Sequence, residues 1–283
     1  MILDGDFMRM NTMANDKERM FKFSLMVMGG SALAIADQYD TIEDYEWVYQ
    51  NKELLELNEQ GFVAKPLSFD HKDIERSSIW AGQLPNGDWI VGFFNREETK
   101  QTRRIDFDKD LGIEGGYASN VRDLWKHKNW GPIYGGYSVE LDPHECQIVR
   151  IKNNSLKYEA EFASMIGGAQ KQTTAFSYSG IGYVGNLRKS GSHVLFAVET
   201  PSRGDYTLRV KYSNTLSRNA IASIYINDEK NAKQLILPSL PSENKWGICE
   251  IEVSLESDFN FISIENGGSD KESFCLDYIE LFK

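Results

Sequence analysis

The first residues of the chain, 1–62, have apolar positions spaced as in helices. Asn15-Asp16-Lys17-Glu18 has the form of a capping box, and Met20–Met28 behind it is apolar nearly all round, as in a buried helix. Ser31–Ala36 is a short apolar run that predicts a strand buried on both faces of a parallel sheet. A second helix is predicted from Thr41, with its inward side chains at Ile42, Tyr45, Val48, Tyr49, Leu54, Leu55 and Leu57. The order helix, strand, helix indicates an α/β segment.

Residues 66–152 change to the two-residue period of β-strands. Ile79–Leu84 and Trp89–Phe94 flank Asn86-Gly87, a dipeptide typical of the turn in a β-hairpin. Tyr137–Leu141 alternates between apolar and polar residues in the same way. The pattern predicts an antiparallel β domain.

The last part of the chain, residues 155–283, is a second series of short strand-like runs separated by turn signals. The runs are 158–162, 193–199, 206–212, 221–227, 248–254, 259–265 and 274–282. Such regularly spaced strands are typical of a β-sandwich. The sequence as a whole therefore predicts a mainly β protein in three parts, residues 1–62, 66–152 and 155–283.

The acidic composition narrows the classes of partner. A net charge of −11 argues against nucleic acid, because phosphate binding needs a basic surface. An anionic membrane surface is unfavourable for the same reason, and no apolar run approaches the ~20 residues that span a bilayer. Neutral sugars remain compatible. The four histidines lack metal-ligand spacing, and the three cysteines are interpreted as small buried hydrophobic residues, with one disulfide as the alternative.

Several separated motifs follow one another along residues 156–283. They are Tyr158-Glu159-Ala160-Glu161, Gly182-Tyr183-Val184-Gly185, Gly204–Tyr212, Ile226-Asn227 and Leu276-Asp277-Tyr278-Ile279. In this order and spacing they resemble the carbohydrate-binding modules of family 35 and the related family 6. The resemblance implies a β-sandwich of the jelly-roll type that binds an oligo- or polysaccharide.

Three carboxylates in these motifs are candidate metal ligands. Glu159 and Glu161 are two residues apart, so on a strand both point to one face, and two like charges so close are favoured by a cation. Asp277, in the last strand, supplies a third carboxylate. Calcium prefers hard oxygen ligands, and the modules that the sequence resembles carry a structural calcium at this place. The alternative is an acidic, solvated strand face.

Aromatic and amide side chains in loop-like positions of the same part are the candidates for sugar contact. They are Tyr183, Asn214, Trp246 and Asn266. An aromatic ring can pack on the apolar C–H face of a pyranose, and amides can hydrogen-bond its hydroxyls. The alternatives are core packing for Tyr183 and Trp246 and a turn-forming role for Asn266.

The first two parts carry a second resemblance. Gln50–Glu59, Phe94-Asn95-Arg96 and Asp123-Leu124-Trp125 resemble pieces of the α-galactosidases of glycoside hydrolase family 27, in the same clan as family 36. The resemblance implies that residues 1–62 are the C-terminal portion of a (β/α)8 barrel. It also implies that residues 66–152 are the antiparallel β domain that follows the barrel.

Two aspartates of the implied barrel portion are candidate substrate contacts. Asp4-Gly5-Asp6-Phe7 resembles the family's segment at the end of barrel strand seven, which makes Asp6 a carboxylate acceptor for a sugar hydroxyl. Asp37 follows the apolar run, where barrel strands end and active-site loops begin. The alternatives are a loop residue without a ligand for Asp6, and for Asp37 a carboxylate that holds its loop through backbone N–H groups.

The two resemblances together give the functional expectation. In the hydrolase family both catalytic carboxylates come from earlier barrel strands, so we expect no catalytic residue here. The chain would be the C-terminal region of an enzyme acting on an α-linked glycan, and would bind carbohydrate without cutting it.

The parent enzyme would be secreted or at the cell surface, although the start of this chain shows no signal peptide. A partial barrel exposes apolar surface, so a second copy or the upstream barrel is expected to cover residues 1–62. The alternatives are a non-catalytic carbohydrate-binding protein and a protein-interaction module.

Overall fold

The computed structural model describes residues 5–188, 191–227, 230–242, 245–267 and 274–283. The chain is mainly β, as the sequence predicts, and divides into two compact units. The first unit holds residues 1–83, 89–106 and 117–152, and the second holds residues 84–88, 107–116 and 153–283. The division therefore does not follow the order of the chain, because two short segments from the middle belong to the second unit.

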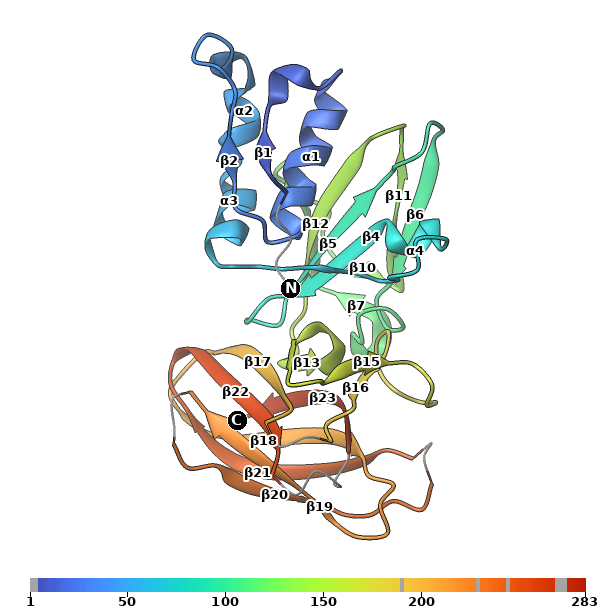
Figure 1. The fold of residues 1–283 in the computed structure, drawn as a ribbon, viewed down its shortest axis with the longest axis vertical. Helices are drawn as coiled ribbons and strands as arrows, with labels where there is room; N and C mark the ends of the chain where they lie inside the picture. The colour runs from blue at the N-terminus through green and yellow to red at the C-terminus, as the bar shows by residue number, and fades with distance from the viewer. Residues whose placement is uncertain (1–4, 189–190, 228–229, 243–244, 268–273) are drawn as a thin grey trace. The chain divides into compact units, whose positions relative to one another are not determined.

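The N-terminal part of the first unit is the predicted α/β segment, and its strands are very short (Figure 1). Its two strands are parallel and lie on either side of α1 in the sequence. The elements are β1 (Phe7–Met8), a 3₁₀ turn (Met10–Thr12), α1 (Asp16–Met28), β2 (Ala34–Ile35), a second 3₁₀ turn (Ile42–Tyr45), α2 (Glu46–Tyr49) and α3 (Lys52–Glu59).

Helix α1 begins where the capping box predicts. The Asn15 side chain accepts a hydrogen bond from the Glu18 backbone N–H at 3.1 Å, and the Glu18 carboxylate accepts one from Ala14 at 3.0 Å. The apolar face of α1 is covered within the same unit, because its Phe21 ring lies 5.0 Å from the Phe94 ring and Phe23 lies 5.9 Å from Trp125. Helix α1 is thus covered within the unit, whereas Phe7 and Ile35 of the two short strands are 50% and 47% exposed. A partner that covers the rest of residues 1–62 stays a prediction.

The run at Ser31–Ala36 differs from its prediction. Only Ala34 and Ile35 form a strand, and both are exposed. Among the described residues β2 pairs with β1 alone, so no sheet formed by them buries both of its faces. The second helix is also interrupted: Thr41 makes no side-chain cap, and the buried Asn51 caps α3 instead by accepting from Leu54 at 3.2 Å.

The remainder of the first unit is antiparallel. A six-stranded sheet has the order β3-β4-β5-β12-β8-β9, and two small two-stranded sheets, β6–β11 and β7–β10, accompany it. The bounds are β3 (Lys65–Pro66), α4 (Ile74–Ser77), β4 (Ile79–Gln83), β5 (Trp89–Phe94), β6 (Gln101–Asp106), β7 (Tyr117–Ala118), β8 (Asn120–Asp123), β9 (Lys128–Asn129), β10 (Ile133–Tyr134), β11 (Gly136–Leu141) and β12 (Cys146–Lys152). The predicted hairpin is β4–β5. Every residue of β5 is buried, since Phe94 contacts Phe21 of α1 while Phe93 contacts Tyr137 of β11.

The second unit is the predicted β-sandwich. One antiparallel sheet has the order β15-β16-β23-β18-β21, with β13 beside β23, and the other has the order β14-β17-β22-β19-β20 (Figure 1). The bounds are β13 (Lys157–Glu159), β14 (Ser164–Ile166), β15 (Gln170–Gln172), β16 (Tyr183–Gly185), β17 (His193–Thr200), β18 (Gly204–Ser213), β19 (Ala220–Ile226), β20 (Lys233–Leu237), β21 (Gly247–Leu255), β22 (Asp258–Asn266) and β23 (Cys275–Phe282). Alternate side chains of the two sheets meet in one core, for example Leu208 and Val210 with Ile262 and Ile264.

Two segments from the middle of the chain complete this unit. The Tyr158 hydroxyl donates to the Pro85 carbonyl at 2.7 Å, and the Lys157 ammonium donates to the Gly112 carbonyl at 3.0 Å. Segment 107–116 therefore lies against β13, where it forms part of the site below. No helix of the described chain is long and apolar enough to cross a membrane. All three cysteines are free.

Candidate functional site

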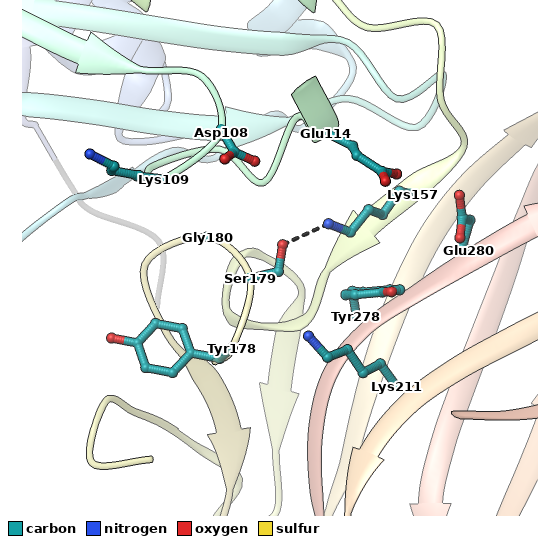
Figure 2. Close-up of a pocket in the computed structure, with 10 residues that line it drawn as sticks. All are labelled: Asp108, Lys109, Glu114, Lys157, Tyr178, Ser179, Gly180, Lys211, Tyr278 and Glu280. Carbon is teal, nitrogen blue, oxygen red and sulfur yellow. Dashed lines mark hydrogen bonds between the residues drawn. The ribbon is translucent and has the colours of Figure 1, made fainter. Parts of the chain in front are cut away.

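A polar cavity of about 430 Å³ opens in the second unit. Its wall comes from segment 107–116, from β13, from the loop before β16, and from β18 and β23, as Figure 2 shows. The side chains that line it are Asp108, Lys109, Glu114, Lys157, Tyr178, Ser179, Lys211, Tyr278 and Glu280, together with Gly180. Such a concave site with converging polar groups is typical of a small-ligand pocket.

Two lysines and a tyrosine ring form the centre of this cavity. The Lys157 ammonium lies 4.3 Å from the centre of the Tyr278 ring, and the Lys211 ammonium lies 5.3 Å from it (Figure 2). Lys157 also donates to the Ser179 hydroxyl at 2.6 Å, and Lys211 to the Ser177 carbonyl at 3.1 Å. Both ammonium groups are thus held in place. Lys157 directs its three N–H donors to Ser179, the Gly112 carbonyl and Glu159, so Lys211 is the lysine that a ligand would meet.

Aromatic rings continue from one edge of the cavity. The Tyr178 and Tyr183 rings are 5.8 Å apart, and the Trp246 ring meets Tyr183 edge-on at 5.3 Å. Tyr183 is buried, whereas Tyr178 and Trp246 are half-exposed. The Trp246 indole donates to the Phe176 carbonyl at 2.8 Å, so its ring is fixed while part of it stays accessible. A fixed, accessible ring is suited to the C–H face of a sugar.

Three carboxylates lie beneath the lysines and are almost completely buried. Lys157 pairs with Glu159 at 3.0 Å, and Lys211 pairs with Asp277 at 2.7 Å. Asp277 also accepts from the Ser179 backbone N–H at 3.0 Å, while Glu161 accepts from a neighbouring amide. The predicted metal ligands are therefore brought together, but two of them already pair with ammonium groups.

Burial and mutual repulsion change the protonation of these acids. Burial raises the pKa of Glu159 to about 7, against the opposing effect of Lys157. Burial, and after it the Glu159 carboxylate, raises the pKa of Glu161 well above its ordinary value. Burial also raises the pKa of Asp277, and Lys211 opposes it. The two lysines supply two positive charges, which are too few to keep all three acids ionised.

One geometric detail of the sequence prediction is wrong. Glu159 ends β13, but Glu161 lies in a 3₁₀ turn (Ala160–Phe162) and not on the same strand. Glu161 is nevertheless buried near Glu159, because the turn directs both carboxylates toward Gly180 in the loop before β16. A Cβ built on Gly180 would lie 2.5 Å from Glu161 Oε1 and 3.5 Å from Glu159 Oε2.

The predicted sugar-contact residues divide into two groups. Tyr183 and Trp246 meet beside the cavity, although Tyr183 is buried and its hydroxyl lies 2.9 Å from that of Thr174. The Asn214 and Asn266 amides lie elsewhere and are bound to backbone: Asn214 donates to the Leu237 carbonyl, and Asn266 donates to Leu187. Both asparagines are buried, so they shape loops.

The two predicted aspartates of residues 1–62 lie in the first unit. Asp6 is exposed, with φ 59°. Asp37 accepts from the backbone N–H groups of Met10 at 2.9 Å and Asn11 at 3.1 Å, and from the Tyr49 hydroxyl. Asp37 therefore has the loop-holding role that the sequence left as its alternative. Asp4 lies outside the described residues.

The lysines and segment 107–116 were not among the residues predicted from the sequence. Lys157 and Glu159 are two residues apart on one strand, so their side chains lie on one face and an ion pair between them was predictable from the sequence. Lys211 faces Asp277 only through the pairing of β18 with β23. Asp108 and Glu114 gave no signal, because they reach the site from a distant part of the sequence.

Comparisons with known proteins agree with this architecture. The model of the α-galactosidase C-terminal β-sandwich domain matches residues 75–151, and that of the family 35 carbohydrate-binding module matches residues 156–228. Isomalto-dextranase of Arthrobacter globiformis is 39% identical over 309 residues, covering 99% of this chain and 47% of that protein. Isomaltosyltransferase of Sporosarcina globispora is 31% identical over 128 residues, covering 45% of this chain and 11% of that protein. The chain thus spans less than half the length of either relative.

A solved structure shows the same fold throughout. The structure of Arthrobacter globiformis isomalto-dextranase complexed with panose has a TM-score of 0.90 and 38% identity, covering 99% of this chain and 50% of that one. The chain is homologous to the C-terminal region of that enzyme. It is therefore a relative of glycoside hydrolases that carries an α-galactosidase-type C-terminal β domain and a family 35 carbohydrate-binding module.

Proposed function

We propose that the second unit binds an α-1,6-linked glucan chain at the polar cavity and the adjoining Trp246. One observation carries the proposal: a polar cavity of about 430 Å³, in which Lys211 is held in place, lies beside fixed aromatic rings in the unit that the carbohydrate-binding module matches. Both relatives are named for isomaltosyl chemistry, which favours gluco- over galacto-configured chains.

The chain itself is proposed to bind glycan without cleaving it, as the C-terminal region of a glycoside hydrolase. The parallel pair β1–β2 with α1 between them supports the proposal that residues 1–62 are the C-terminal portion of a (β/α)8 barrel. A retaining hydrolase needs two accessible carboxylates. Glu159 and Glu161, the neighbouring carboxylates beneath the cavity, are 2% and 1% exposed and therefore do not meet this requirement.

The test is calorimetric titration of the whole chain with isomaltopentaose, and affinity electrophoresis through gels containing dextran. We expect binding, and we expect Trp246→Ala to weaken it about tenfold or more. Stacking of a nucleobase on an aromatic side chain contributes ~1–3 kcal/mol, a sugar ring on Trp246 is expected to gain a similar amount, and tenfold corresponds to about 1.4 kcal/mol. Trp130→Ala is the matched control, because Trp130 is 41% exposed and lies in the first unit.

The outcomes separate the alternatives. Retardation by galactomannan and not by dextran would reassign the ligand to a galacto-configured chain. Absence of binding to any glycan would favour a protein-interaction module. Hydrolysis of nitrophenyl glycosides by the purified chain would contradict the absence of a catalytic pair.

We further propose that calcium binds at Glu159, Glu161 and Asp277 as a structural ion. Three buried carboxylates face two lysines, and burial and mutual repulsion raise the pKa of Glu161, so a further cation would be stabilised there. As they stand in the described residues, no three acidic, histidine or cysteine side chains are placed so that they could hold a metal ion, so calcium binding would require these carboxylates to rearrange. Calcium would therefore compete with the lysines and with the proton on Glu161.

Thermal melting with and without a chelator distinguishes neutralisation of the carboxylates by calcium from neutralisation by the lysines and a proton. If calcium is bound, the chelator lowers the melting temperature through binding linkage, and Glu161→Gln removes that difference. A melting curve that the chelator leaves unchanged would show that the lysines and a proton suffice.

A further inference from the structure

A second cavity, of about 450 Å³, lies in the first unit. Residues of α1, of the α4–β4 segment and of the end of β5 line it, together with His144 before β12. Its wall is mostly apolar, in contrast to the polar cavity of the second unit. Nothing in the function proposed above uses it.

Three aromatic rings form the floor of this cavity. The buried Phe94 ring meets Phe21 edge-on at 5.0 Å and Trp80 edge-on at 6.5 Å. Phe21 and Trp80 are only half-buried, so their surfaces face the cavity. The Trp80 indole donates to the Ser77 carbonyl at 3.2 Å, which holds its ring in one orientation. The floor is therefore formed before any ligand arrives.

Charged side chains with fixed positions form the rim. The Arg96 guanidinium donates to the hydroxyls of Ser77 at 2.8 Å and Ser78 at 3.1 Å. The Glu18 carboxylate lies 3.4 Å from the His144 ring. The rim thus presents a donor and an acceptor of hydrogen bonds above an aromatic floor.

This combination selects a class of ligand. A wholly apolar ligand would desolvate the charged rim without replacing its hydrogen bonds, which is unfavourable. The lining carries charges of both signs, Lys22 and Arg96 against Glu18, so it is not specific for a strongly anionic ligand. A neutral sugar has apolar C–H faces for aromatic rings, and hydroxyls that both donate and accept, so it satisfies floor and rim together.

We propose that this cavity is a second saccharide-binding site, which holds one or two glucosyl units of the same α-linked glucan. The ligand class rests on the proposed function of the second unit, whereas the site is separate, since all its lining residues belong to the first unit. A polymer that reaches both sites binds more tightly than a short oligosaccharide that occupies one.

The experiment is calorimetric titration of the whole chain with isomaltopentaose, in a Trp246→Ala background that weakens the first site. Residual binding is expected in this background. We expect Trp80→Ala or Arg96→Gln, added to it, to reduce that residual affinity about tenfold or more. Trp130→Ala, added in the same way, should leave it unchanged. Arg96 is exposed, so its variant reports on binding even if Trp80→Ala destabilises the unit.

Each outcome gives a decision. If the Trp246→Ala chain binds no saccharide, or if Trp80→Ala and Arg96→Gln both leave its affinity unchanged, the second site is refuted and the first stands. If Trp246→Ala has no effect while Trp80→Ala abolishes binding, the second site stands and the proposed first site fails. If the unaltered chain binds no saccharide, both proposals fail.

Discussion

Gly112 holds segment 107–116 close to a buried carboxylate, and Gly115 has the same backbone conformation in open space. The φ angles are 63° and 72°. A Cβ built on Gly112 would lie 1.8 Å from Glu159 Oε1 and 2.8 Å from Ser179 Oγ, whereas no atom lies within 4 Å of the Cβ built on Gly115. Alanine therefore strains the backbone at both positions but collides with a neighbour only at Gly112.

The two substitutions should differ by the energy of that collision. A left-handed conformation costs a non-glycine residue about 1–2 kcal/mol, which is the expected loss in the free energy of unfolding for Gly115→Ala. Gly112→Ala must also move Glu159, which is 2% exposed and bonded to Lys157 and Ser179. A hydrogen bond to a charged group contributes about 1.5–3 kcal/mol, so the loss expected for Gly112→Ala when one such bond breaks is about 2.5–5 kcal/mol in total.

Urea unfolding of the whole chain measures both values in the transition of the second unit. Isomaltopentaose titration supplies a second readout, because segment 107–116 lines the polar cavity. We expect weaker binding for Gly112→Ala and unchanged binding for Gly115→Ala. Equal stability losses for the two variants would refute the packing of Gly112 against Glu159.

Two further predictions concern the first unit. Asn51→Ala removes the cap of α3 and the amide that donates to the buried Leu124 carbonyl at 3.0 Å, so the free energy of unfolding should fall by about 2–4 kcal/mol in urea unfolding. Asn51→Ser keeps an uncharged cap acceptor and should lose less, and equal losses would contradict this. Hydrogen bonds to two glutamates raise the pKa of His144, so its stabilising contribution is complete at low pH and is lost as the pH rises through that raised value. The melting temperatures of the unaltered chain and His144→Gln should therefore differ more at pH 6 than at pH 8.5, and a constant difference would argue against the pairing.

Local patterns in the sequence predict most elements of this fold. The cap at Asn15 depends on residues within one helical turn, and the hairpin β4–β5 depends on adjacent strands, so both were readable. The period of two predicted the sandwich for the same reason. The prediction that Ser31–Ala36 is a strand buried on both faces was wrong, because an apolar run does not indicate how many strands lie beside it.

The candidate site was less predictable, because long-range pairing assembles it. Glu159 and Asp277 come together through β13 and β23, and their lysine partners were not expected. Asn214 and Asn266 have the chemistry of sugar contacts, but their amides satisfy buried backbone carbonyls. Residue type predicts what a side chain can bind, whereas the fold determines which partner it contacts.

Segment 107–116 has a practical consequence for work on this protein. It lies before residue 152 in the sequence, yet its Gly112 carbonyl accepts from Lys157, and its Asp108 and Glu114 line the polar cavity. A fragment cut at residue 153 would keep every strand of the sandwich and lose one wall of its cavity. Such a fragment could fold and still fail to bind, and that failure would report on the cut and not on the module.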